Sequence, residues 1–284
     1  MAQFKNKVAL VTGGGSGIGK ALCQALARGG AIVVVSDVDE ATCAMVAQEI
    51  RDAGGRAESV VLDVVDGDRF SEVVQAIEEE HGALDLLFNN AGIGVGGEAH
   101  NFKTEDWDRL VDVNIRGVLH GVVAAYPRMV ARRAGAIVNI ASLAGLVPTP
   151  GMAGYGMSKH AVVGLTTSMR AEANAYGVGM SVVCPGFIES NIYTSSKMVG
   201  WDRTTLMSHP ALRKKMKASR CADVILKGVA SNRPIITVTR HAFWGWRAYR
   251  AFPWVFWSWF GQRAYDSVRA RSGRVDRGDA VTEE

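Results

Sequence analysis

The sequence predicts a doubly wound α/β protein, in which about seven parallel strands form a single sheet with helices on both faces. Short runs of apolar and β-branched residues recur along the first 240 residues, and segments long enough for helices separate them. A glycine cluster directly follows the first run. Strands buried on both faces have such continuous apolar runs, and parallel strands need helical crossovers between them. The alternation therefore favours a parallel sheet over a sandwich or a helical bundle.

The elements are expected in a regular order. A strand at Val8–Val11 precedes the glycine cluster, and a helix with apolar spacing covers Ile18–Ala27. The next strand, Ala31–Val35, stops at Ser36 and Asp37 and leads into a helical pattern that continues to about Arg51. Five further strands are predicted at residues 59–62, 84–88, 136–140, 179–183 and 235–238.

Residues 1–240 are expected to form one domain, because no Pro/Ser-rich linker and no internal repeat interrupts them. Residues 190–220 are polar with isolated apolar side chains, which is typical of a loop over a binding site. A solvated helical insertion is the alternative. Residues 241–284 form an aromatic and basic extension.

The composition of the chain excludes several classes of protein. With 284 residues and 48% hydrophobic residues, the chain is too apolar to be disordered. The net charge of +4 hides an uneven distribution. Residues 1–196 carry 15 Lys/Arg and 21 Asp/Glu, whereas residues 197–284 carry 17 and 7. Of the 22 aromatic Phe, Trp and Tyr residues, ten lie between Phe243 and Phe260.

The cysteines and histidines indicate neither disulfides nor a metal site. The four cysteines are far apart and lie in or next to apolar segments, so we expect buried thiols of a reducing compartment. The six histidines do not cluster, so no metal is expected. The N-terminus lacks the apolar region of a signal peptide, and we expect a cytoplasmic protein.

The glycine cluster indicates a dinucleotide site. Gly13, Gly17 and Gly19 lie between the first strand and the first helix, where a pyrophosphate can approach the backbone and the helix N-terminus. Asp37, at the end of the second strand, can accept hydrogen bonds from ribose hydroxyls and would repel a 2′-phosphate. Ser16 and Val38 are uncharged. NAD is therefore predicted over NADP; the alternative role for Asp37 is that of a helix N-cap.

A second group of residues indicates catalysis. Ser142 follows the predicted strand 136–140, and Tyr155 and Lys159 are four residues apart in a helical segment. Side chains at this spacing lie on one face of a helix, so the ammonium can stand near the phenol. A cation there lowers the pKa of Tyr155 towards neutrality, which makes the phenol a usable general acid/base.

The chain resembles the short-chain dehydrogenase/reductase family over roughly residues 5–240, and this resemblance implies a Rossmann-type fold. The matching motifs occur in the family's order: TGGGSGIG at 12–19, Asp37, Leu62-Asp63-Val64, NNAG at 89–92, Asn114 in VDVNIRG, Ser142 in NIAS, YGMSK at 155–159 and PGFIES at 185–190. One departure is Ser190, at a position where the family commonly has Thr.

The resemblance implies a role for each matched residue. The catalytic residues are Asn114, which holds a water in a proton relay, Ser142, which binds the substrate oxygen, Tyr155 and Lys159. Gly13 and Ile18 flank the pyrophosphate, Asp37 binds a ribose, Asp63 and Val64 border the adenine, and Pro185, Gly186 and Ile188 border the nicotinamide. The full set implied to bind the cofactor is Gly13, Ser16, Gly17, Ile18, Gly19, Asp37, Asp63, Val64, Asn90, Ala91, Gly92, Tyr155, Lys159, Pro185, Gly186, Ile188 and Ser190.

The aromatic extension has two interpretations. Its rings can pack on a neighbouring subunit or cap the substrate cleft, or residues 241–263 can contact a membrane surface, because Trp and Arg suit the boundary of an anionic bilayer. Arg and Pro within the segment disfavour a membrane-spanning helix. The family resemblance implies a homodimer or homotetramer, and no nucleic-acid partner is expected.

The sequence thus predicts an NAD-dependent oxidoreductase that interconverts a secondary alcohol and a ketone of a bulky hydrophobic molecule, such as a steroid-like, retinoid-like or long-chain compound. Two alternatives stay open. One is an NADPH-dependent biosynthetic ketoreductase, against which Asp37 argues. The other is a nucleotide-binding regulator without catalysis, against which the intact catalytic residues argue.

Overall fold

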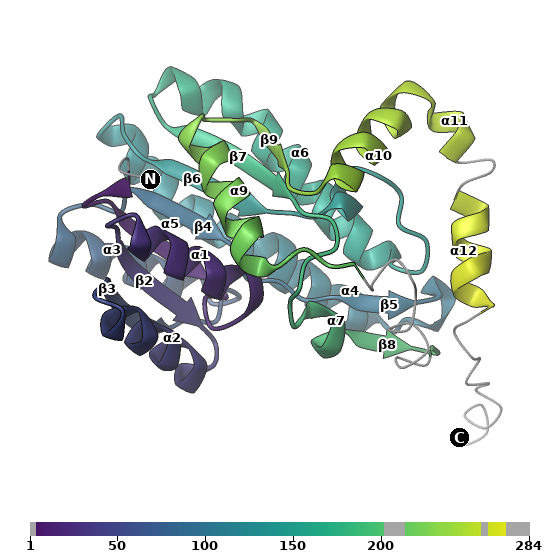
Figure 1. The fold of residues 1–284 in the computed structure, drawn as a ribbon, viewed down its shortest axis with the longest axis horizontal. Helices are drawn as coiled ribbons and strands as arrows, with labels where there is room; N and C mark the ends of the chain where they lie inside the picture. Colours follow the sequence, from purple (N-terminus) through teal and green to yellow (C-terminus); the bar gives the residue numbers. More distant parts are fainter. Residues whose placement is uncertain (1–3, 202–213, 257–260, 271–284) are drawn as a thin grey trace.

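A parallel sheet of seven strands forms the centre of the molecule (Figure 1). The computed structural model describes residues 4–201, 214–256 and 261–270. The strand order is β3-β2-β1-β4-β6-β7-β9. The strands are β1 (Val8–Thr12), β2 (Ile32–Asp37), β3 (Arg56–Val61), β4 (Leu86–Asn89), β6 (Ala136–Ile140), β7 (Gly179–Cys184) and β9 (Ile235–Thr237). The predicted fold and all seven strands are confirmed, with shifts of a few residues at their ends.

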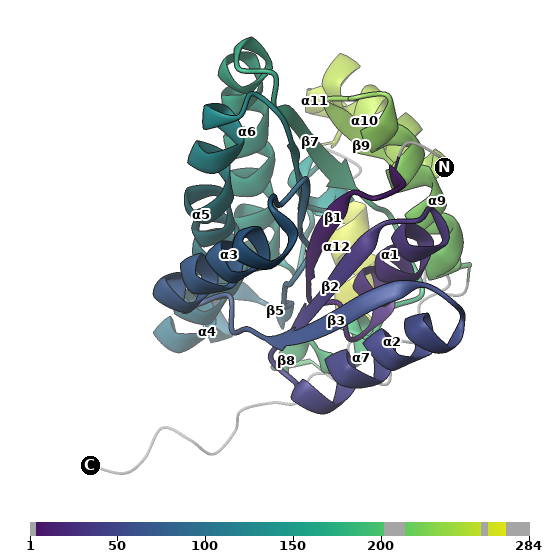
Figure 2. The same ribbon diagram turned by 90° about the vertical axis from the view of Figure 1, so that its left-hand side faces the viewer.

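Helices cover both faces of this sheet, as Figure 2 shows. One layer contains α1 (Gly17–Arg28), α2 (Glu40–Asp52) and α9 (Ala218–Ala230), and the other contains α3 (Gly67–His81), α5 (Gly117–Ala131) and α6 (Ala153–Ala175). Each layer buries its own apolar cluster against the sheet. The central strands contribute to both clusters, which is why their sequences are apolar without alternation.

The strand order reverses between β1 and β4, and this reversal positions the functional site. From β1 the chain builds outward to β3, returns to β4 beside β1, and then builds outward in the other direction. The loops that leave β1 and β4 therefore diverge to opposite faces and open a crevice at the carboxyl ends of the strands.

The segment expected to be a loop at residues 190–220 contains regular structure. It forms α7 (Ile192–Ser195) and β8 (Lys197–Val199), and α9 begins at Ala218. Strand β8 pairs in parallel with β5 (Val95–Gly97). A pairing of three residues between segments a hundred positions apart leaves no periodicity that the sequence could reveal. Residues 202–213 lie outside the described part of the chain.

The described part of the extension is helical. It forms α10 (Arg240–Ala251), α11 (Pro253–Val255) and α12 (Gly261–Arg269). Figure 1 shows α10, α11 and α12 along one end of the molecule. The side chain of Thr239 caps α10 by accepting from the Ala242 N–H, and Pro253 occupies the first turn of α11, where its missing N–H costs nothing. Within the described residues, no helix combines the length and the hydrophobicity needed to cross a bilayer.

The four cysteines are free and buried, as predicted. Burial raises the pKa of the thiols of Cys184 and Cys221 to about 12, so both are neutral at physiological pH. These thiols contribute packing rather than charge.

Candidate active site

A cavity of about 1050 Å³ opens at the crevice between the β1 and β4 loops. Its walls include nearly all of the site residues predicted from the sequence: Gly13, Ser16, Gly17, Ile18, Asp37, Asp63, Val64, Asn90, Ala91, Gly92, Ser142, Tyr155, Lys159, Pro185, Gly186, Ile188 and Ser190. Two predicted residues, Gly19 and Asn114, do not line it. The fold thus brings together motifs that span 178 positions of the sequence, from Gly13 to Ser190.

The glycine loop forms one wall of the cavity. Gly13 and Gly17 have φ angles of 64° and 53°, a region that residues with a Cβ seldom adopt. A Cβ on Gly19 would overlap the carbonyl oxygen of Gly13, so Gly19 allows α1 to pack against the loop. Ser16 precedes α1 without capping it through its side chain. The first N–H groups of α1 are consequently presented at the cavity wall.

Asp37 faces this loop from the end of β2. Its carboxylate accepts from the backbone N–H of Gly15 at 3.0 Å and from that of Asp39 at 3.3 Å. The alternative role as an N-cap is excluded, because Asp39 caps α2 by accepting from the Thr42 N–H. The Asp37 carboxylate therefore lies in the cavity wall beside the glycines.

Two further loops complete this half of the cavity. The Asp63 carboxylate accepts from the Val65 N–H at 3.0 Å and so stabilises the turn in which it lies. Val64, the next residue, is buried. Asn90 donates from its amide to the carbonyl oxygens of Thr12 and Gly13, at 2.9 and 3.1 Å. Asn90 thereby holds the glycine loop against the loop after β4.

The other half of the cavity contains the predicted catalytic residues Ser142, Tyr155 and Lys159. Ser142 caps the short 3₁₀ turn Leu143–Gly145 by accepting from the Ala144 N–H, and its side chain also interacts with Tyr155 on α6. Tyr155 and Lys159 lie one turn apart on α6, and the Lys159 Nζ is 5.8 Å from the centroid of the Tyr155 ring. This ammonium donates to the Ile140 carbonyl at 3.0 Å, which ties α6 to the end of β6.

Burial dominates the titration of both groups. It raises the pKa of Tyr155 to about 12, although a hydrogen bond with Ser142 acts in the opposite direction. It lowers the pKa of Lys159 to about 8. In the protein alone, burial thus acts on the pKa of Tyr155 in the direction opposite to the one expected from a neighbouring ammonium.

Asn114 lies behind the cavity, in a π-helical turn at Asp112–Arg116 between α4 (Thr104–Val111) and α5. Its side chain is fully buried and accepts from the Ile93 N–H while donating to the Ile93 carbonyl and to the Ser158 hydroxyl. Asn114 thus joins the loop after β4 to α6 at Ser158, the residue before Lys159.

The segment after β7 borders the same half, and residues of the extension support it. The Phe187 N–H donates to Nε2 of His241 at 3.3 Å, and the two rings stack with centroids 5.2 Å apart. A Cβ on Gly186 would overlap both His241 and Thr239. Sequence reasoning missed His241, because a single His at the start of an aromatic segment carries no motif.

The outer wall of the cavity is mostly apolar. It is formed by Phe187, Tyr193 and Trp201 together with residues 147–152, Ile192 and Met198. Trp201 is buried and packs on Gly151, which has a φ of 77°. Burial raises the pKa of Tyr193 as well. The sequence offered no signal for Tyr193, since one Tyr in a polar segment fits an exposed loop equally well.

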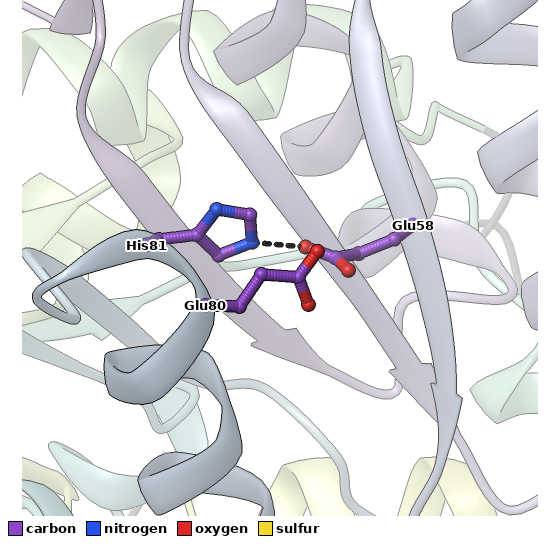
Figure 3. Close-up of side chains that lie close together, drawn as sticks. All are labelled: Glu58, Glu80 and His81. Atoms are coloured by element: carbon purple, nitrogen blue, oxygen red, sulfur yellow. Dashed lines mark hydrogen bonds and ion pairs between the residues drawn. The ribbon is translucent and has the colours of Figure 1, made fainter.

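Glu58, Glu80 and His81 place three potential metal ligands close together, away from the cavity (Figure 3). Nε2 of His81 lies 2.5 Å from a Glu58 carboxylate oxygen. His81 ends α3 and Glu58 lies on the edge strand β3. We interpret this contact as a tie between helix and strand, since nothing else in the described structure points to an ion there.

The comparisons with known proteins agree with this arrangement. Residues 7–198 match the short chain dehydrogenase family. The probable oxidoreductase EphD of Mycobacterium tuberculosis is 38% identical over 249 residues, which cover 84% of this chain but 42% of that protein. The chain thus matches less than half the length of this curated relative.

Two further proteins match over most of their own length. The 3-oxoacyl-[acyl-carrier-protein] reductase FabG of Thermotoga maritima is 34% identical over 79% of this chain and 90% of its own. The crystal structure of a short chain dehydrogenase/reductase from Burkholderia phymatum in complex with NAD has a TM-score of 0.81 and 33% identity, and the match covers 90% of this chain and 96% of that one. The chain belongs to the short-chain dehydrogenase/reductase family of oxidoreductases.

Proposed function

We propose that the protein is an NAD-dependent oxidoreductase that interconverts a secondary alcohol and a ketone, with Tyr155 as the general acid/base. The observation that carries the proposal is the shared cavity, whose walls hold the glycine loop and Asp37 in one half and Ser142, Tyr155 and Lys159 in the other. The residues proposed for the cofactor and for the reaction thus border one continuous space. Residues 1–240 are the proposed catalytic domain.

The first half of the cavity suits a dinucleotide. Glycines with positive φ and the N-terminus of α1 provide a close approach and unpaired N–H groups for a pyrophosphate. The Asp37 carboxylate suits two ribose hydroxyls and opposes a 2′-phosphate, which favours NAD. Asp63, Val64 and the Asn90–Gly92 segment would border the adenosine, and Pro185, Gly186, Ile188 and Ser190 the nicotinamide. The cofactor, when bound, supplies the site that accepts or donates hydride.

The chain's own residues would handle the proton and the geometry. In the oxidative direction the phenolate form of Tyr155 would take the alcohol proton and become the phenol, and the Ser142 hydroxyl would hold the substrate oxygen. A protonated Lys159, whose Nζ is 5.8 Å from the centroid of the Tyr155 ring, would favour the phenolate and so oppose burial, which favours the neutral phenol. Because the side chain of Asn114 is engaged with Ile93 and Ser158, we assign the proposed relay water to the Asn114 backbone carbonyl, within the π-helical turn.

We further propose that the substrate is bulky and hydrophobic. The support is the apolar outer wall, where Phe187, Tyr193 and Trp201 border the same cavity as Tyr155. Burying the apolar surface of a steroid-like, retinoid-like or long-chain alcohol there is favourable, and the polar groups at the catalytic end would orient it.

The alternatives differ in cofactor and in turnover. The similarity to FabG favours the alternative of a ketoreductase. That alternative predicts a preference for NADPH with keto substrates. A regulator without catalysis would bind a dinucleotide and turn over no alcohol.

A panel of cyclic and long-chain secondary alcohols and their ketones, assayed through the absorbance of the reduced nicotinamide, separates these possibilities. We expect turnover with NAD that exceeds turnover with NADP. A preference for NADPH would overturn the cofactor proposal. Sedimentation velocity on the same protein tests the homodimer or homotetramer that we propose from the family.

A further inference from the structure

Tyr193 is a titratable side chain in the cavity wall that the proposed mechanism does not use. It lies on α7 and lines the same cavity as Tyr155. The two phenols are close enough for their charges to interact, since Tyr193 acts to raise the pKa of Tyr155. A second phenol therefore borders the space next to the proposed proton-transfer group.

Contacts with the segment after β7 and with the start of the described residues beyond 213 hold Tyr193 in place. The Lys215 Nζ lies 4.2 Å from the centroid of the Tyr193 ring. Met216, the next residue, donates its N–H to the Phe187 carbonyl at 3.0 Å. The Tyr193 oxygen has a hydrogen bond with the backbone of Ile188. The phenol is thus positioned by the same segment that would border the nicotinamide.

The hydroxyl of Tyr193 keeps a proton that it can donate. Burial raises the pKa of Tyr193, so the phenol is neutral at physiological pH. The backbone group of Ile188 that acts to lower this pKa is its N–H, so the phenol oxygen accepts that bond and its own proton is not used there. Among the described residues, none accepts a hydrogen bond from the Tyr193 hydroxyl.

The neighbouring hydroxyls of the cavity are engaged with the backbone. Thr149, Ser195 and Ser196 also line it, and each donates to a backbone carbonyl within four positions of its own. Tyr193 is therefore a hydrogen-bond donor in a wall that is otherwise mostly apolar. Such a donor discriminates strongly between ligands, because a ligand without a matching oxygen leaves it unpaired and poorly hydrated.

We propose that the Tyr193 hydroxyl donates a hydrogen bond to a second oxygen of the substrate, so that the protein acts on hydrophobic alcohols or ketones that carry a further hydroxyl or carbonyl group. This inference rests on the proposed function and narrows its substrate class. Ser142 and Tyr155 would bind the reacting oxygen, Tyr193 would bind the second one, and the apolar wall would contact the carbon skeleton. Two bound oxygens fix which carbon atom is presented for hydride transfer.

The test compares the wild type with Tyr193→Phe on matched probes. Cyclohexanol is paired with the positional isomers of cyclohexanediol, and a long-chain secondary alcohol is paired with diols of the same length. We expect the wild type to prefer a diol, and Tyr193→Phe to lower kcat/KM for that diol by about tenfold. The value for the matching mono-alcohol should stay within about twofold of the wild type, because the variant keeps the ring and loses only the hydroxyl.

The matched control is Tyr126→Phe, because Tyr126 is half-buried on α5 and does not line the cavity. This variant should keep the wild-type values with every probe, and both variants should keep their melting temperature. A purely structural role of Tyr193 would lower kcat/KM equally for the diol and the mono-alcohol, and equal losses overturn the inference. Equal losses together with weaker NAD binding would assign the hydroxyl to the cofactor instead.

The outcomes also separate this inference from the proposed function. Turnover of mono-alcohols with NAD, without a diol preference in the wild type or with the same preference in Tyr193→Phe, overturns the inference and leaves the proposed function standing. If the wild type turns over no probe, the proposed function fails, and calorimetric titration of the same probes into the protein with NAD tests the contact alone. Equal dissociation constants of diol and mono-alcohol for the wild type would then overturn the inference as well.

Discussion

Asp37 shows what one side chain can decide. Its carboxylate lies at the end of β2 and accepts from the Gly15 N–H, where a 2′-phosphate on the ribose would meet a negative charge. Asp39, two residues later, has the same chemistry but caps α2. The two residues therefore form a natural pair of test and control for the cofactor proposal.

We expect Asp37→Ser to lower kcat/KM with NAD by about tenfold to a hundredfold and to raise it with NADP, because ribose hydrogen bonds are lost and repulsion is removed. Asp39→Ser keeps an N-cap and should leave the cofactor ratio unchanged. Steady-state kinetics with both cofactors checks the prediction. An unchanged ratio in Asp37→Ser would remove Asp37 from the cofactor site.

The burial of Lys159 destabilises the folded protein to an extent that depends on pH. Its folded pKa is about 8 and its ordinary value is 10.5, so between these values the unfolded chain holds a proton that the folded protein has released. The contribution of Lys159 to the free energy of unfolding therefore rises with pH between 8 and 10.5 and is lowest below pH 8.

The measurement is urea unfolding of the wild type and of Lys159→Met at several pH values. The difference in free energy of unfolding, wild type minus variant, should rise by up to about 3 kcal/mol between pH 8 and 10.5. Subtracting the variant cancels the titration of groups that both proteins share. A difference that stays flat would show that Lys159 is not desolvated.

Ser142, Tyr155 and Lys159 were predictable as a group, because their spacing is a local property of one turn and one helix. Their pKa values were not predictable. The sequence shows that a lysine stands near a phenol, but it does not show that both are buried, and burial raises the pKa of Tyr155 to about 12. Desolvation is a property of the assembled fold.

At the scale of elements, α4 and β8 are joined by an ion pair between distant parts of the sequence. Lys197 Nζ lies 2.5 Å from a carboxylate oxygen of Asp106, whose side chain is 4% exposed. Burial acts to raise the pKa of Asp106, but the Lys197 contact and the Lys103 N–H hold it below its ordinary value. The pair fixes β8 and with it the outer wall of the cavity.

We expect Asp106→Asn to lower the free energy of unfolding by about 1 kcal/mol at pH 7, since it removes the buried carboxylate from its ion pair with the exposed Lys197. A carboxylate whose pKa is lower in the folded than in the unfolded protein stabilises the fold at pH values above its ordinary pKa of 3.8. This stabilisation is lost as the pH falls through the pKa of the folded protein. The difference in free energy of unfolding between the wild type and Asp106→Asn should therefore become smaller as the pH falls below about 5. Asp108→Asn, an exposed neighbour on α4, is the control, and an equal effect there would refute the assignment.

The start of α10 is a second junction between elements. Because the Phe187 N–H can only donate, Nε2 of His241 must accept, so the contact requires a neutral His241. Burial lowers the pKa of His241, which favours that form. His241 is a positioning residue for the segment that would border the nicotinamide.

We expect His241→Phe, which keeps a ring against Phe187 but loses the acceptor, to lower kcat by about tenfold. His241→Gln, which can restore an acceptor, should recover part of this loss. Trp244→Ala, on the same helix but exposed, should have no effect on kcat. Equal kcat values in His241→Phe and wild type would show that the contact does not position the segment.

Across the whole molecule, the sequence predicted what depends on repeating local patterns. The order of strands and helices follows from apolar runs, and the site residues of the core follow from motifs at strand ends. The β5–β8 pair, the wall formed by Tyr193 and the contact of His241 with Phe187 were missed. Each joins segments far apart in the sequence through one or a few side chains, and no periodicity records such contacts.

The proposed function requires that one cavity combine a dinucleotide site with a proton-transfer group at Tyr155. The most direct test measures NAD binding and NAD-linked alcohol oxidation in the wild type and in Tyr155→Phe. We expect turnover by the wild type, a kcat at least about a hundredfold lower in Tyr155→Phe, and a dissociation constant for NAD within about twofold of the wild type. A Tyr155→Phe variant that keeps nearly the wild-type kcat would contradict it.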